Sequence, residues 1–316
     1  MSNNSTGEFQ NLFNFYKKLG GKGNILSSPE TPFLFVHKNK VLNRRIIKEM
    51  MDVEVKEKKE GVDINLKIKK KMKVEKPIYL CFGVLPPQGV QVINMHLVVE
   101  DDAVCKIFAH CIFPFAKKVI HKMNGELFIG KNAEFTYNEV HFHGEEGAEV
   151  IPHLRGEAGE NSKLNSEFSL IEGCVGILDI DYSFKVKEKG ICELLTKVYG
   201  KKKDKIKIKE TIYLSGAYSK GLAKSRVVLK DKAKSEVTGS IIATASYARG
   251  HVDCKEIVQD EAEASAYPLV CSKNEKATVT HEAAIGSLDR KQVQTLMAKG
   301  LSQSQAIDMI IRGILR

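Results

Sequence analysis

The sequence predicts a mainly β protein whose short strands follow one another through most of the chain, with helical segments at both ends. Three observations support this fold class: β-type runs continue from about residue 62 to residue 284, a turn pattern recurs among them, and helical apolar spacing is confined to the ends. The 316 residues can bury a large core and form one long domain or two ordinary ones. We divide the chain into an N-terminal helical or irregular segment (1–60), a β core (61–286) and a C-terminal helical segment (287–316).

The N-terminal segment is expected to hold one short amphipathic helix. Residues 8–19 (EFQNLFNFYKKL) have apolar residues at helical spacing, and the Gly20-Gly21 pair is a typical helix stop. A proline-punctuated stretch follows at residues 27–35, and a second short helix is expected over residues 41–51.

The β core consists of short β-type runs separated by turn residues, without a convincing helical period. The runs are VQVINMHLVVE, AEFTYNEVHF, GILDIDYSFKV, ICELLTKVY, SRVVLK, SEVTGSIIA, HVDCKEIV and ATVTHEA. A polar turn leading into an alanine or another small residue recurs in EDDAVCKI, GKNAEFTY, KDKAKSEV, QDEAEASA and NEKATVTH. Such a repeat, with no helix between strands, fits a solenoid of coils stacked about 4.8 Å apart. A two-sheet sandwich also needs many short strands, so the pattern leaves both architectures open.

The C-terminal segment is expected to form two helices. An apolar stripe within residues 288–297 marks the first helix, and Gly300 is well placed to end it. Ser302 with Gln305 three residues later gives the second helix a capping-box start, and its own stripe covers residues 306–314. Part of this apolar surface is expected to pack on the β core, which leaves the rest for a partner.

The formal charge of +10 raises the question of nucleic-acid binding. The lysines, however, lie in alternating segments such as INLKIKKKMKV, where every second residue tends to be apolar, as on the wet face of a strand. Tryptophan is absent and aromatic residues make up only 7%, so surfaces for base stacking are poorly supplied. We therefore expect no nucleic-acid partner.

Membrane insertion and nucleotide hydrolysis are also not expected. Residues 1–10 are polar, and no apolar run approaches the roughly 20 residues that span a bilayer, so we expect a cytoplasmic protein. The stretch GELFIGK (125–131) has the glycine and lysine spacing of a P-loop. Asn132, however, stands where Ser or Thr should bind magnesium, and no helix pattern begins there, so we interpret it as a turn between strands.

The seven cysteines are scattered, and no CxxC pair occurs, which argues against a zinc ribbon or a thioredoxin-like motif. In a reducing compartment most of them are expected to be buried small hydrophobic residues. They are Cys81, Cys105, Cys111, Cys174, Cys192, Cys254 and Cys271.

A histidine-rich stretch, NEVHFHGEEGAEVIPH, is a candidate metal site. In a strand His141 and His143 point the same way, with His153 nearby, and such groups can hold a divalent metal. The alternative is that this His-x-His strand is simply a polar face.

A second candidate site joins Cys254 with His281. Strand alternation places Cys254 on a small and apolar inward face, places His281 on the inward face of the later strand, and turns Glu282 the other way. In a solenoid the two strands would lie one or two coils apart. A thiol beside a histidine can be held as the thiolate that binds iron or carries sulfur. Spacing alone favours the structural interpretation, a buried cysteine and a satisfied core histidine.

Three stretches resemble the SufB/SufD family of iron–sulfur cluster assembly proteins. They are YARGHVDCKEIVQ, IEGCVGILDIDYSFKV and the ending KATVTHEAAIGSLDRKQVQTLMAKGLSQSQAIDMIIRGILR. The resemblance is strongest over residues 139–316 and weak before about residue 60. It implies a right-handed parallel β-helix core and a C-terminal helical segment that docks a SufC-type ATPase. The chain would then be a non-enzymatic scaffold, a homodimer or a SufB/SufD-type heterodimer, on which a transient iron–sulfur cluster is built for recipient apo-proteins.

The same resemblance assigns roles to the second candidate site. In SufB-type members a cysteine matching Cys254 and a glutamate matching Glu282 are implicated in building the cluster, and in SufD-type members a histidine matching His281. This chain carries all three, so it is more similar to SufB. It differs from typical bacterial SufB in a shorter N-terminal region and in lacking the CxxCxxxC motif that some members have.

Two other functional hypotheses remain. One is a β-solenoid binding module that recruits an ATPase without carrying a cluster. The other is a metal-dependent enzyme built on His141, His143 and His153.

Overall fold

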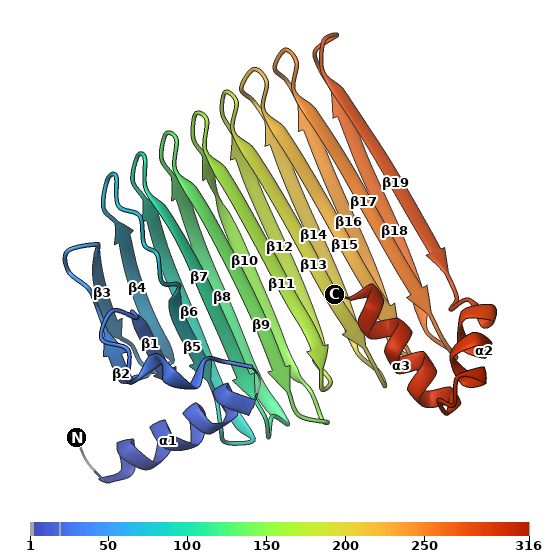
Figure 1. Cartoon of the computed structure of the whole chain (residues 1–316), viewed down its shortest axis with the longest axis horizontal. Coiled ribbons are helices and arrows are strands. Elements are labelled where there is room, and N and C mark those ends of the chain that lie inside the picture. The colour runs from blue at the N-terminus through green and yellow to red at the C-terminus, as the bar shows by residue number, and fades with distance from the viewer. Residues whose placement is uncertain (1–2, 19, 316) are drawn as a thin grey trace.

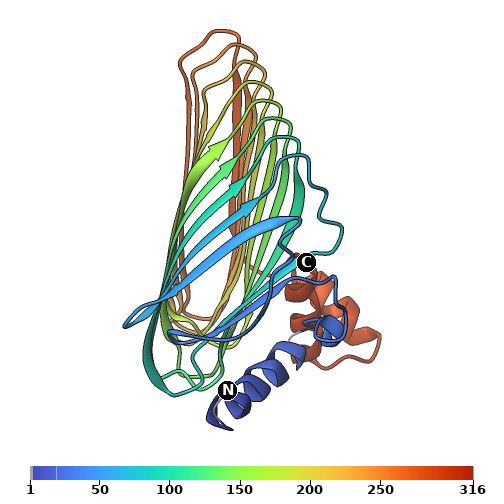
Figure 2. The ribbon, with the colours of Figure 1, turned by 90° about the vertical axis from the view of Figure 1, so that its left-hand side faces the viewer.

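One chain winds between two sheets to form a flattened solenoid (Figures 1 and 2). The computed structural model describes residues 3–18 and 20–315. From the second coil onward, each coil contributes one strand to each sheet, and strands of successive coils pair in parallel. This arrangement confirms the predicted solenoid and excludes the two-sheet sandwich that the strand pattern had left open, because sandwich strands pair antiparallel.

The two sheets have ten and nine strands among the described residues. Sheet A runs, in spatial order, β19 (Thr278–Gly286), β17 (Arg249–Val258), β15 (Lys220–Leu229), β13 (Ile191–Gly200), β11 (Lys163–Glu172), β9 (Glu134–His143), β7 (Val104–Phe113), β5 (Ile78–Gly83), β1 (Phe33–His37) and β2 (Lys40–Arg45). Sheet B runs β18 (Glu263–Ser272), β16 (Lys234–Ala243), β14 (Lys205–Leu214), β12 (Gly176–Val186), β10 (Ala148–Ala158), β8 (Lys118–Ile129), β6 (Gln88–Val99), β4 (Gly61–Ile68) and β3 (Met51–Glu57). Every β-type run expected from the sequence lies in one of these strands.

The recurring turn pattern marks corners of the coils. Asp102 and Asn132 adopt the left-handed conformation, with φ of 59° and 56°, and the alanine after each of them is fully buried. The Asn132 side chain donates a hydrogen bond to the Asp102 carboxylate at 2.9 Å, which ties two successive corners together. Short polar residues tolerate this conformation and a small residue fits the crowded corner, which explains why the two occur together in the repeat.

The N-terminal end of the solenoid is closed by chain reversals. The strands β1 and β2 pair antiparallel, as do β3 and β4, so the first coil does not offer a parallel edge. The helix expected over residues 41–51 is therefore wrong, since most of that segment forms β2 and the start of β3. Leu42 of this hairpin packs in the buried cluster that the N-terminal helix forms with sheet A. Such a tertiary contact outweighs the local preference for a helix.

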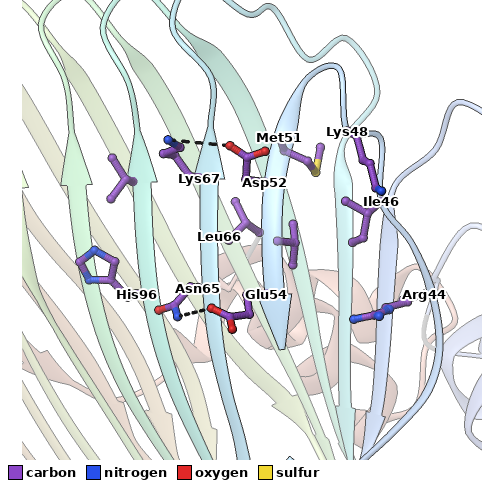
Figure 3. A pocket seen from close by; sticks show the side chains of 12 residues that line it. Arg44, Ile46, Lys48, Met51, Asp52, Glu54, Asn65, Leu66, Lys67 and His96 are labelled. Carbon is purple, nitrogen blue, oxygen red and sulfur yellow. Dashed lines mark hydrogen bonds and ion pairs between the residues drawn. The ribbon is translucent and has the colours of Figure 1, made fainter. Parts of the chain in front are cut away.

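An open groove lies on the outer surface near this end, over β3, β4 and β6 (Figure 3). Its lining mixes charges with apolar residues, and Lys67 lies 3.8 Å from Asp52 within it. No cysteine lines the groove, and Figure 3 shows its side chains spread over the strands instead of converging on one point.

The N-terminal helix α1 (Asn3–Lys18) covers the outer face of sheet A, and a short 3₁₀ turn (Gly23–Ile25) follows it. Leu12, Phe13 and Tyr16 of this helix form a second buried cluster with aromatic residues of β1 and β5. The helix expected over residues 8–19 is thus present, but it begins earlier, and residue 19 lies outside the described residues.

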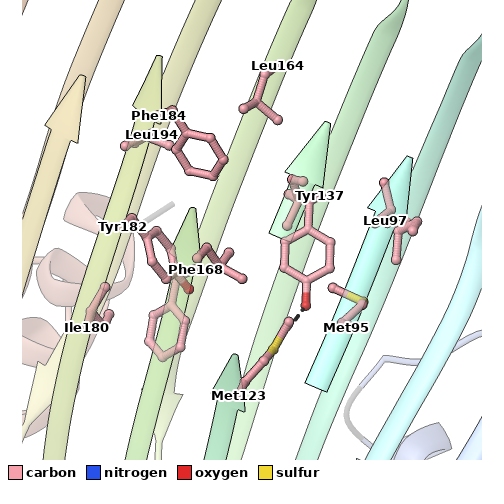
Figure 4. Close-up of a cluster of buried hydrophobic side chains, with 14 of the residues drawn as sticks. Met95, Leu97, Met123, Tyr137, Leu164, Phe168, Ile180, Tyr182, Phe184 and Leu194 are labelled. Carbon is pink, nitrogen blue, oxygen red and sulfur yellow. Dashed lines mark hydrogen bonds between the residues drawn. The ribbon is translucent and has the colours of Figure 1, made fainter. Parts of the chain in front are cut away.

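The core fills the space between the sheets with inward-facing residues of successive coils, and Figure 4 shows its middle part. Strand β14 shows the alternation clearly: its lysines at 205, 207 and 209 are exposed, while Ile206 and Ile208 are buried. Most of the lysine-rich pattern is thus the wet face of strands, as the sequence indicated. Around Tyr137 and Phe168 the interior is aromatic. Stability of the middle coils therefore comes from apolar burial.

Two helices follow the last strand: α2 (Arg290–Ala298) and α3 (Gln303–Ile314). The predicted capping box of Ser302 and Gln305 is present. Ile311 of α3 packs on the outer face of sheet A, against Val228 and Ile257, so all three helices lie on the same side of the solenoid (Figure 2). Within residues 3–18 and 20–315, no helix combines the length and the apolar character that crossing a membrane requires.

Candidate functional site

Cys254 lies inside the next-to-last coil. It belongs to the inward row of β17 and is only 2% exposed. In the neighbouring strands, Ser225 of β15 and Ala283 of β19 occupy the matching register positions. Gly239, on β16, also lies close by, because a Cβ atom there would lie 2.6 Å from Val252 Cγ1 and 3.5 Å from Cys254 Sγ. The thiol is therefore surrounded by small side chains and is buried in the isolated chain.

His281 lies in the last coil, on the strand directly paired with that of Cys254. Its register partner is Val252, so it shares the inward row with Cys254 and is offset from it by two residues. From strand geometry, this offset separates the two Cα atoms by about 8 Å. The imidazole is exposed, because no further coil covers it. The predicted facing of both strands is confirmed.

Glu282 points to the other side of the same strand. Its register partner is Asp253, an outward residue whose carboxylate makes a two-pronged ion pair with Arg226. The ion pair with Arg226 lowers the pKa of Asp253. Within one chain, Glu282 therefore lies across the strand from the row that holds Cys254 and His281.

Two buried carboxyl groups lie near Cys254, and the sequence interpretation did not single them out. Glu256 follows Cys254 on the same inward row, and Glu210 comes from β14 in the facing sheet. Thr196 donates a 2.6 Å hydrogen bond to Glu210, and Ser235 donates one to Glu256. The alternation of inward and outward positions could have revealed both. In HVDCKEIV and KIKIKETIYL each glutamate lies two residues after an inward-facing residue, so it faces inward as well.

Burial controls the protonation of this interior. It raises the pKa of Cys254 above that of a free thiol; the nearby Ser225 hydroxyl offsets part of the rise, and Glu210 and Glu256 add to it. Burial also raises the pKa of both carboxyl groups to about 7. In the isolated chain, Cys254 is accordingly a thiol at neutral pH, with two neighbours near their own titration points.

The C-terminal end of the solenoid is open, in contrast to the closed N-terminal end. The strands β18 and β19 are the last of their sheets, and their outer edges have no partner strand in the described chain. Apolar side chains remain exposed there, including Leu269, Val270 and Ile285. Natural proteins seldom leave strand edges of this length exposed, and another chain or segment usually covers them.

The histidine-rich stretch does not form the group that the sequence suggested. His141 and His143 are both buried on the inward row of β9, whereas His153 points outward on β10. The polar-face alternative is also wrong, since the two inward histidines are almost completely buried. They join Cys111 of β7, His121 of β8 and Glu139 of β9 instead.

Of the seven cysteines, six are buried and Cys271 is exposed on the outward row of β18. Burial raises the pKa of Cys111 well above its ordinary value and lowers the pKa of His121 and His143 well below theirs. Cys111 was missed as a candidate because its partners come from two other strands, β8 and β9.

Comparison with known proteins agrees with this architecture. Residues 86–314 match the family described as SUF system FeS cluster assembly, SufBD core domain. An iron-sulfur cluster assembly SufBD family protein of Methanocaldococcus jannaschii is 38% identical over 264 residues, which cover 83% of this chain and 84% of that protein. One from Pyrococcus horikoshii is 32% identical over 312 residues, covering 99% of this chain and 95% of that protein. The chain therefore belongs to the SufBD family of iron–sulfur cluster assembly proteins.

Proposed function

We propose that the protein is a scaffold on which an iron–sulfur cluster is assembled, in association with a SufC-type ATPase. The observation that carries this proposal is the placement of Cys254 and His281 on one inward row at the open end of the solenoid. A thiol and an imidazole are ligands that iron accepts. The open end provides the access that a transient cargo needs.

Cys254 is the proposed iron ligand, and its proton must leave when iron binds. Glu256 and Glu210 are suited to receive that proton, since each has a pKa of about 7 and is partly ionised at neutral pH. In a poorly solvated interior a thiolate is stabilised when a positive iron ion is bound to it, and an ionised Glu256 or Glu210 offsets the remaining positive charge.

We further propose that a second subunit covers the open end. A second copy of this chain, or a related chain, would pair with the edges of β18 and β19 and bury Val270 and Ile285. Glu282 supports this arrangement: it points away from Cys254 in its own chain, so it can join a cluster more readily from the partner. In a symmetric dimer, Cys254 of one chain would work with Glu282 of the other.

The ATPase is proposed to dock on the C-terminal helices. The inner stripe of α3 is already used against sheet A, but α2 has no buried residue, and Met297 and Met309 are exposed. An apolar hollow beside Met309 also involves Leu301. Methionine-rich exposed surfaces are typical of protein contact sites.

Anaerobic reconstitution with ferrous iron and sulfide tests the scaffold proposal. The wild-type protein should retain iron and acid-labile sulfide and absorb visible light, and Cys254→Ser should lose most of both, because a serine hydroxyl is a poor iron ligand. Melting should barely change, since burying one hydroxyl costs only about 1–3 kcal/mol. Cys271→Ser is the matched control on the outward face.

Two outcomes would contradict the proposal. Equal losses of iron in the two variants would indicate nonspecific thiol binding. A wild-type protein that binds the ATPase but retains no iron and sulfide would instead favour a binding module without a cluster.

A further inference from the structure

A polar cluster lies inside the N-terminal half of the solenoid, well away from Cys254. Its members face inward from three strands and are at most 2% exposed. They are Cys111, His121, Glu139, His141 and His143. An interior that is mostly aliphatic and aromatic thus holds five polar side chains in one place, which is unfavourable unless each finds a partner.

The distances within the cluster are short. The Cys111 Sγ lies 3.7 Å from His121 Nε2 and 3.8 Å from Glu139 Oε1. The His141 Nε2 lies 2.5 Å from the same Glu139 oxygen. Cys111, Glu139 and His141 each offer one ligand atom, and these three atoms all lie within 4.8 Å of one another. Backbone pairing fixes this closeness, because Cys111 and His141 are direct register partners on β7 and β9.

Three atoms of the cluster have no hydrogen-bond partner within the described protein. They are His121 Nδ1, Glu139 Oε2 and His143 Nδ1, and all are buried. A buried polar atom without a partner costs about 1–3 kcal/mol. Clusters with several such atoms call for an additional bound species, either an ion or ordered water.

We propose that this cluster binds one divalent transition-metal ion through Cys111, Glu139 and His141, with His121, which contacts Cys111, as the fourth ligand. A thiolate, a carboxylate and an imidazole together suit borderline ions such as Zn²⁺ or Fe²⁺, and they suit Ca²⁺ or Mg²⁺ poorly. The thiolate and the carboxylate carry two negative charges, so a divalent ion leaves the buried site neutral.

Two of the distances in the cluster are already close to those between ligands of a bound ion. Tetrahedral bonds of ordinary length place neighbouring ligand atoms about 3.5 Å apart. The separations of Cys111 Sγ from His121 and Glu139 already match this value. The contact between Glu139 and His141 must open by about 1 Å as an ion replaces their direct hydrogen bond. His143 is the last residue of β9, so the site lies near one end of the strands that form it.

The site is separate from the proposed cluster site. Glu139 and Cys254 lie in the same inward column of sheet A, four coils apart, which is about 19 Å. Phe168 is the next residue of that column after Glu139 and is 1% exposed. The metal site can therefore be tested independently of the scaffold function.

The test uses the full-length protein with Cys254 and Cys271 both replaced by Ser, freed of metal with a chelator. This background protein should bind one Zn²⁺ per chain in equilibrium dialysis, and Co²⁺ should give thiolate-to-cobalt charge-transfer absorption. Adding Cys111→Ala should abolish the absorption and weaken Zn²⁺ binding by more than about tenfold. Cys105→Ala is the matched control, since Cys105 is buried on the inward row of the same strand.

Glu139→Gln provides a second variant that keeps the side-chain shape if Cys111→Ala fails to fold. It should also weaken Zn²⁺ binding, and Zn²⁺ should raise the melting temperature of the background protein but not of this variant. Replacement of the outward His153 by Ala should change nothing. Absence of the cobalt absorption in the background protein would overturn the proposal, as would its survival in Cys111→Ala or undiminished Zn²⁺ binding by Glu139→Gln.

Discussion

The free energy of unfolding of the Glu210→Gln variant, measured relative to that of the wild-type protein, should increase as the pH rises. Burial raises the pKa of Glu210 from 4.5 to about 7, against the opposing effect of the hydrogen bond from Thr196. Between these two values the folded protein holds a proton that the unfolded chain releases. The stabilisation from that proton is complete below pH 4.5 and disappears as the pH rises through 7.

The magnitude follows from the two pKa values. Each unit of difference corresponds to 1.36 kcal/mol, so the full effect is about 3 kcal/mol. Between pH 5 and pH 8 the wild-type protein should lose about 2.5 kcal/mol of unfolding free energy through this group alone. Gln cannot ionise, so Glu210→Gln escapes this loss while its amide oxygen can still accept the hydrogen bond from Thr196.

Urea unfolding at the two pH values, followed by far-ultraviolet circular dichroism, measures the effect. The quantity of interest is the difference between variant and wild type, because the other titrating groups are common to both and cancel. Glu236→Gln is the control, since Glu236 is exposed on the outward face of β16. If the difference between Glu210→Gln and wild type is the same at pH 5 and pH 8, Glu210 is not linked to folding and its burial has been misjudged.

Two further predictions concern partners. Met309→Asp places a charge on the exposed surface of α3 and should weaken binding of a SufC-type ATPase by at least about tenfold, or 1.4 kcal/mol, in titration calorimetry. The melting temperature should not fall. Ser304→Asp on the same helix is the matched control, and equal weakening by both variants would contradict a specific site. Chains carrying Cys254→Ser and chains carrying Glu282→Gln should each reconstitute little cluster alone, whereas unfolding and refolding them together should restore part of it, because half of the mixed dimers' sites would combine an intact Cys254 with an intact Glu282. No recovery on mixing would place both residues of a site in one chain.

Strand alternation predicted most of the β core, because each strand buries one face and wets the other. It gave the facing of Cys254, His281 and Glu282 from the sequence, and the turn repeat located the corners at Asp102 and Asn132. It failed over residues 41–51, where pairing of β1 with β2 decides the structure and no local pattern reports that pairing.

The two interior polar groups could be predicted only in part, since each combines residues from separate coils or from facing sheets. Glu210 and Cys111 are separated in sequence from the residues they meet. The alternation of inward and outward residues along a strand identifies each of them as inward-facing. Their meeting depends on the number of residues per coil: 29 residues separate Ile191 from its partner Lys220, and 29 separate Lys220 from Arg249, whereas earlier corners shift this count.

That register explains how one solenoid can hold two chemically different interiors. A single inward column of sheet A passes through Ala109, Glu139, Phe168, Thr196, Ser225, Cys254 and Ala283. Toward its C-terminal end the column is polar from Thr196 to Cys254, and only Ala283 follows it before the open end. Toward its N-terminal end Glu139 belongs to the buried histidine cluster, and β7 and β5 lie between it and the closed end. Phe168 separates the two polar stretches, so no continuous run of polar side chains along this column connects them. Because the coils stack in parallel and in register, a substitution in one coil can change the site in that coil. The residues of the other site, in other coils, keep their places.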